Sequence, residues 1–87
     1  GAAGWGSIWQ RKEGARFTHG IEVVGGSLRL AELGLSWPAG SKPRLLGARV
    51  GGKEVAADLT GGRILFSPEV LLGGESRRDL RVEIAIA

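Results

Sequence analysis

The chain has 87 residues, with no cysteine, no methionine and a single histidine, and its formal net charge is +3. A chain of this length has material for one hydrophobic core, so we expect a single domain. The absence of cysteine excludes a disulfide framework, a zinc site built on thiolates and a thiol nucleophile. An apolar content of 43% and a charged content of 24% are those of a folded globular domain.

Basic residues are scattered along the chain, and the only clusters, Arg11-Lys12 and Arg77-Arg78, have acidic neighbours. A nucleic-acid or membrane surface normally concentrates its basic residues, so we expect no membrane partner and nucleic acid is disfavoured. No apolar run reaches the ~18 residues of a membrane span, and no signal peptide opens the chain. Residues 1–4 resemble a linker end or a cloning remnant. We therefore interpret residues 1–87 as one module excised from a larger multidomain protein.

The first half of the chain alternates apolar and polar residues with a period of two, which predicts strands. Alternation over 17–23 leads to Gly25-Gly26, which is typical of a two-residue hairpin turn. Apolar residues then fall on even positions at Leu28 and Leu30 and on odd positions afterwards. This change of parity at Ala31-Glu32 predicts a β-bulge.

The second half repeats the pattern of strands and glycine turns. Residues 36–43 hold two prolines, a glycine and two serines and predict a loop. Alternating runs on either side of Gly51-Gly52 predict a hairpin, and residues 60–62 predict another turn. A strand over 63–67 is interrupted by Pro68, a short run ends at Gly73-Gly74, and the final strand covers 80–86.

Short strands at spacings of about 8–12 residues, with turn signals between them, predict an all-β fold. We expect an antiparallel immunoglobulin-like β-sandwich of seven to eight short strands, because the proline-rich loop suits strands divided between two sheets. A small OB-like barrel is the alternative.

Candidate catalytic residues are few. His19 lies at an inward position, where it is a general base, a metal ligand or a strand histidine hydrogen-bonded to its surroundings. Most glutamates alternate with apolar residues and indicate solvated strand faces instead of a catalytic pair. The glycine pairs lead into strands and lack the context of a phosphate loop. We therefore predict a non-enzyme without a cofactor or a metal site, although a calcium ion held by backbone carbonyls leaves no trace in a sequence.

The tryptophans carry the main functional signal. In an extended segment Trp5 and Trp9 lie on one face about 13 Å apart, with Gln10 and Arg11 beside them. Indoles cover the apolar face of a pyranose, and neighbouring amide and guanidinium groups bind its hydroxyls. Trp37, in the proline-rich loop, extends this platform. The alternative is that these rings pack in the core or against a missing domain. Base stacking of single-stranded nucleic acid uses the same rings but needs a basic groove.

Residues 28–86 resemble a C-terminal accessory β-sandwich domain of bacterial glycoside hydrolases. The likeness lies in the hairpin of residues 44–55, the run of residues 62–75 and the last strand at 80–84. These are similar to the family's "V.V.G..V", "F..PV.L..GE" and "L.V.I" patterns, except that residues 76–79 are inserted before the last strand. The resemblance implies carbohydrate binding or packing against a catalytic domain, and it carries over no binding residue.

The function predicted from these observations is a non-catalytic carbohydrate-binding or accessory module of a polysaccharide-degrading enzyme. Its expected partners are a polysaccharide or oligosaccharide and the catalytic domain of the parent chain, in an extracellular or secreted protein. The predicted site residues are Trp5, Trp9, Trp37, Gln10 and Arg11. The alternatives are a purely structural or protein-interaction domain and, less favoured, single-stranded nucleic-acid binding.

Overall fold

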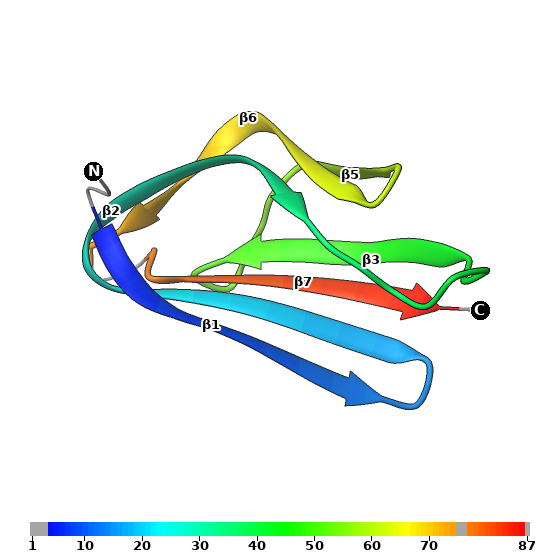
Figure 1. The fold of residues 1–87 in the computed structure, drawn as a ribbon. Coiled ribbons are helices and arrows are strands. Elements are labelled where there is room, and N and C mark those ends of the chain that lie inside the picture. The colour runs from blue at the N-terminus through cyan, green and yellow to red at the C-terminus, as the bar shows by residue number, and fades with distance from the viewer. Residues whose placement is uncertain (1–3, 75–76, 87) are drawn as a thin grey trace.

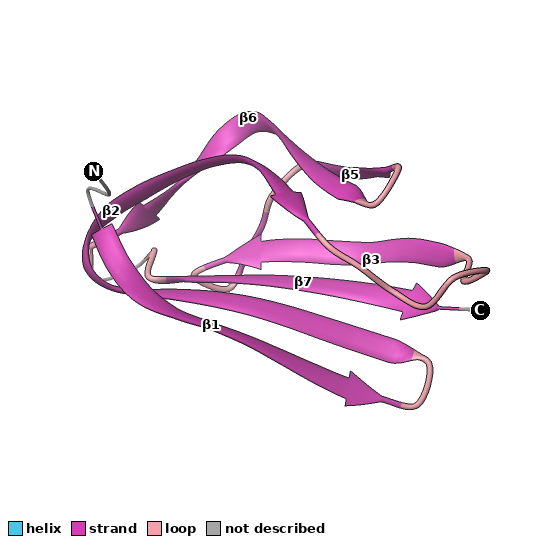
Figure 2. Cartoon of the chain, in the orientation of Figure 1, coloured by secondary structure: helices cyan, strands magenta, loops and turns pink. Residues whose placement is uncertain are grey.

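A computed structural model of the chain describes residues 4–74 and 77–86, and everything regular in this part is β-strand (Figures 1 and 2). In this part of the chain the strands number seven, within the predicted seven to eight, and every pairing is antiparallel. No helix in the described residues is long and apolar enough to cross a membrane. The strands are β1 (Gly4–Glu13), β2 (Arg16–Gly34), β3 (Pro43–Val50), β4 (Lys53–Glu54), β5 (Ala57–Thr60), β6 (Arg63–Gly73) and β7 (Asp79–Ile86).

The strands form one curled sheet, a half-barrel, in the order β4-β3-β7-β2-β6-β5, with β1 added on β2 (Figure 1). The predicted two-sheet sandwich is therefore wrong. The observed curled sheet is closer to the alternative prediction, an OB-like barrel, although it closes only halfway. The cause is β2, whose 19 residues pair with β1 and β7 in the first part and with β6 in the second. The single bent strand β2 thus contributes to both sides of the half-barrel.

The predicted hairpin at Gly25-Gly26 is also wrong, because β2 passes through both glycines without reversing. Gly26 has φ of +70°, a left-handed conformation that glycine adopts without steric cost, and the strand bends there. Neighbouring β1 follows this bend, with Trp5 opposite Gly25, and its register shifts between Trp5 and Gly6.

Other local predictions are confirmed. The register of β2 against β6 shifts between Leu30 and Glu32, which is the predicted bulge. Gly51-Gly52 joins β3 to β4, and Gly61-Gly62 joins β5 to β6. The strand expected after Gly52 is shorter than predicted: β4 ends at Glu54, and β5 pairs with β6 instead of β3.

Pro68 bends β6 instead of ending it. The strand runs from Arg63 to Gly73 through a cis Ser67-Pro68 bond. Leu30 of β2 pairs with Val70, whereas Glu32 pairs with Leu65, so the residues around Pro68 form an outward bulge with few partners on β2. A proline fits there because it has no N–H to donate to the sheet.

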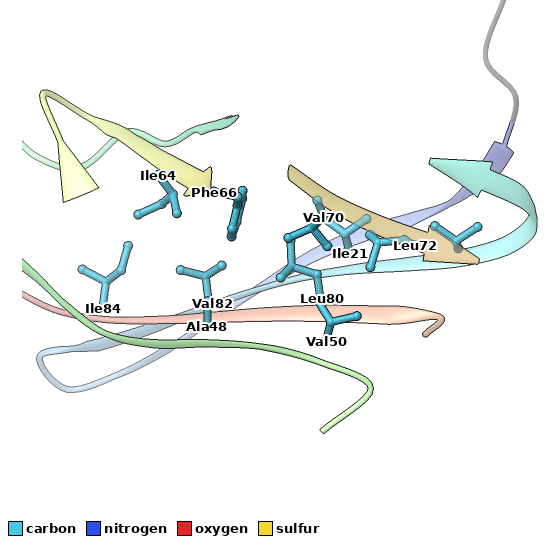
Figure 3. Close-up of a cluster of buried hydrophobic side chains, with 11 residues drawn as sticks. Ile21, Ala48, Val50, Ile64, Phe66, Val70, Leu72, Leu80, Val82 and Ile84 are labelled. Carbon is cyan, nitrogen blue, oxygen red and sulfur yellow. The ribbon is translucent and has the colours of Figure 1, made fainter. Parts of the chain in front are cut away.

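The core lies on the concave side of the curled sheet, which we call the inner face; the convex side is the outer face. Side chains of β6 such as Ile64 and Phe66 point toward Val82 and Ile84 of β7 (Figure 3). Burying each of these side chains contributes about 1.5–3 kcal/mol to stability. The described residues of β1 add nothing to this core, whose buried members are Ile21, Val23, Ala48, Val50, Ile64, Phe66, Val70, Leu72, Leu80, Val82 and Ile84.

Candidate functional site

Trp9 lies on the outer face, over a glycine of the neighbouring strand. Trp9 of β1 pairs with Gly20 of β2, so their side-chain positions share the outer face. The Cε2, Cζ2 and Nε1 atoms of the indole occupy the space that a Gly20 side chain would fill. A glycine inside a strand commonly marks such a close approach. The missing side chain thus lets the ring settle onto the sheet, where Trp9 is partly exposed.

Two guanidinium groups lie over the Trp9 ring. Arg11 follows two residues along β1, and its Cζ lies 5.9 Å from the ring centroid. Arg81 of β7 pairs with Gly20 on the far side of β2, and its Cζ lies 5.6 Å from the centroid. Each such cation–π contact is worth about 0.5–1 kcal/mol at an exposed site. The indole therefore joins strands that do not pair with each other.

A groove of about 430 Å³ surrounds this ring. Two exposed ion pairs line it, Arg11 with Glu13 at 3.6 Å and Arg16 with Glu83 at 3.9 Å. Exposed pairs of this length contribute about 0–1 kcal/mol each, so a ligand can rearrange them at little cost. We call this site the Trp9 groove; its lining residues are Trp9, Arg11, Glu13, Arg16, Thr18, Arg81 and Glu83.

The Trp9 groove contains only part of the predicted site. Trp9 and Arg11 lie in it as expected. Gln10 is exposed on the inner face, opposite His19, because successive residues of a strand point to opposite sides. Trp37 packs partly buried against the core, away from any platform with Trp9. The side chain of Trp5 lies outside the described part of the chain.

Sequence reasoning missed Gly20 and Arg81, and also Arg16, Thr18 and Glu83. One signal was available: Gly20 interrupts the polar positions of an alternating strand, which suggests that another group approaches there. For Arg81 there was none, because its place beside Trp9 depends on the registers of two separate strand pairs.

His19 is buried on the inner face, away from the groove, and is 9% exposed. Its ring stacks on Phe17, with centroids 6.5 Å apart and planes 14° apart. Burial lowers the pKa of His19, so the imidazole is neutral at pH 7. Within the described residues its Nε2 has no hydrogen-bond partner, so this nitrogen does not meet the expectation of a hydrogen-bonded histidine.

In residues 4–74 and 77–86 no three His, Asp or Glu side chains lie together in a way that could hold a metal ion. A second groove, of about 280 Å³, runs along the inner face beside β1 and is mainly apolar. Ile8 of β1 borders it with 79% of its surface exposed, and Leu28 and Leu30 of β2 also line it.

Comparison with models of protein families, with curated proteins and with solved structures finds no match to this chain. The resemblance of residues 28–86 to accessory domains of glycoside hydrolases therefore stays a prediction.

Proposed function

We propose that the protein is a non-catalytic carbohydrate-binding module, an accessory to a polysaccharide-degrading enzyme that acts outside the cell. The observation that supports this most directly is the Trp9 ring, which lies over Gly20 at the surface of a groove lined by hydrogen-bonding groups. The indole covers the apolar C–H face of a pyranose, and the surrounding guanidinium, carboxylate and hydroxyl groups bind its hydroxyls.

Rigidity of the site favours this function. Trp9, Thr18 and Arg81 come from three neighbouring hydrogen-bonded strands, so the strand pairings set the relative positions of their backbones. A site built on strands loses less conformational entropy on binding than one built on loops. The sheet therefore holds the indole at a fixed place, while the Arg11 and Arg81 guanidinium groups over it can move aside when a sugar ring stacks there.

The test is affinity electrophoresis of the protein in gels that contain neutral or acidic polysaccharides, supported by a glycan array. We expect at least one glycan to bind, and Trp9→Ala to weaken it at least about tenfold, as expected for a central aromatic contact. Ile8→Ser is the matched control, because Ile8 lies on the same strand with its side chain on the opposite face. Binding that survives Trp9→Ala, or no binding to any glycan, would refute the proposal.

The inner groove supports a second candidate, a structural or protein-interaction domain that packs against a neighbouring domain. Ile8 is 79% exposed beside an apolar groove, and such a surface is costly to leave in water. This function predicts that the hydrophobic dye ANS binds the native protein and that Ile8→Ser reduces its fluorescence. An unchanged ANS signal in Ile8→Ser, together with a positive glycan screen, would rule this candidate out.

A further inference from the structure

Two arginines lie directly opposite each other on the outer face. Arg49 of β3 pairs with Arg81 of β7, and both line a hollow of about 110 Å³ next to the Trp9 groove. Like charges placed directly opposite in a sheet destabilise it. The pair therefore carries a cost that an anion between the two guanidinium groups would relieve.

No carboxylate of the described residues neutralises Arg49. Glu54 lies opposite Arg49 on β4, yet no ion pair joins them. Arg81 has one partner, Asp79, at 3.8 Å. Glu83 borders the hollow, but its carboxylate is paired with Arg16. The hollow thus brings together two arginines, of which Arg49 has no ion pair among the described residues.

The hollow adjoins the Trp9 groove, because Arg81 and Glu83 line both. Trp9, Gly20, Arg81 and Arg49 form one row across β1, β2, β7 and β3. With neighbouring strands ~4.8 Å apart, the row is about 14 Å long. A short oligosaccharide lying across the strands can therefore contact the indole at one end and both guanidinium groups at the other.

The cation–π contacts of Arg11 and Arg81 with Trp9 affect whether the site prefers neutral or anionic sugars. A neutral sugar must displace the Arg11 and Arg81 guanidinium groups from the indole before it can stack there. A neutral sugar offers these guanidinium groups only hydroxyl acceptors, whereas an anionic sugar replaces the contacts by hydrogen bonds in which both partners are charged, with bidentate geometry available to each arginine. The displaced Arg81 then gains a partner that it shares with Arg49.

We infer that the site selects glycans with anionic groups, carboxylates or sulfates, and that Arg49 and Arg81 hold the anionic group while Trp9 stacks on the sugar. This inference rests on the proposed carbohydrate-binding function. It adds Arg49, which lies outside the Trp9 groove, as a specificity-determining residue.

The experiment compares matched ligands on the whole chain by isothermal titration calorimetry. Polygalacturonate is compared with its methyl ester, which has the same backbone without the charge, and dextran sulfate with dextran. We expect the charged member of at least one pair to bind at least about tenfold tighter, and the pair identifies carboxylate or sulfate as the recognised group.

Two variants of equal charge localise the effect. Arg49→Gln should weaken the charged ligand about tenfold, while its melting temperature stays equal or rises because a like-charge contact is removed. Arg63→Gln on β6 removes the same charge far from the row and should change the affinity less than about twofold.

Each other outcome overturns the inference. Equal binding of the charged and uncharged ligands with loss in Trp9→Ala would leave a carbohydrate module without anionic selection. Equal weakening by Arg49→Gln and Arg63→Gln would mean diffuse attraction by net charge. Single-stranded DNA that binds as tightly and depends on Arg49 would point to nucleic acid. No binding to any glycan would remove the proposed function as well.

Discussion

Replacing Gly20 by alanine should displace Trp9 from the outer face. A Cβ at Gly20 would overlap the Cε2, Cζ2 and Nε1 atoms of the indole. The backbone itself accepts alanine, because Gly20 is not among the glycines with a left-handed φ. All the strain therefore falls on the contact with Trp9, and the ring must move away from the sheet.

The expected change in stability is a small net loss. Moving the ring sacrifices the two cation–π contacts with Arg11 and Arg81, each worth about 0.5–1 kcal/mol. Alanine returns about 0.5–1 kcal/mol, because the unfolded chain has less backbone freedom than with glycine. At the midpoints of these ranges the difference is a loss of about 0.75 kcal/mol, equivalent to roughly 3–6 °C in melting temperature for a domain of this size.

The assay combines thermal unfolding with tryptophan fluorescence in a Trp5→Phe, Trp37→Phe background, where Trp9 is the only emitter. Gly20→Ala should shift the emission to the red, increase quenching by acrylamide and weaken glycan binding. Gly34→Ala is the matched control, because Gly34 lies on the same strand as Gly20 and a Cβ there meets no atom within 4 Å. If Gly20→Ala leaves the emission and the melting temperature where Gly34→Ala does, Trp9 does not rest on Gly20.

Two further predictions concern the core. Because burial lowers the pKa of His19, the unfolded state binds a proton more readily than the folded state. The free energy of unfolding should therefore be constant above about pH 6.5 and fall as the pH drops below it, and this slope should disappear in His19→Leu. A wild-type slope retained in His19→Leu between pH 5 and 7 would contradict this. Leu80→Ala should cost about 2–5 kcal/mol by urea unfolding, because Leu80 is 1% exposed, whereas the exposed Ile8→Ala should cost less than about 0.5 kcal/mol. Similar losses in the two variants would mean that Leu80 is not in the core.

Local patterns predicted the strands and most turns, because alternation and glycine pairs act over a few residues. They failed at Gly25-Gly26, where a hairpin turn and a strand bend use the same residue type with positive φ. The choice between them depends on pairing with β1 and β6, which are distant in the chain. Because β2 continues through this glycine pair, the structure has one curled sheet where two sheets were predicted.

For the site, the same distinction between local and distant information applies. Trp9 and Arg11 are close in the sequence and share a strand face, so they could be predicted together. The same alternation puts Gln10 on the other face, so the prediction of Gln10 beside the tryptophans is wrong. Arg81 reaches Trp9 only because two registers align across Gly20, and no short sequence window contains that alignment.

Strand β1 is attached to the rest of the fold less firmly than its neighbours, and this affects ligand binding at the outer face. Its described side chains bury nothing in the core, and its backbone pairs only with β2 among the described strands. Such a strand opens locally at a lower free energy than β2 or β7. A ligand that contacts both Trp9 and Arg81 links β1 to β7 across β2. Part of its binding free energy therefore stabilises β1, the strand that carries the indole. Affinity at this face and the local stability of β1 are therefore thermodynamically linked.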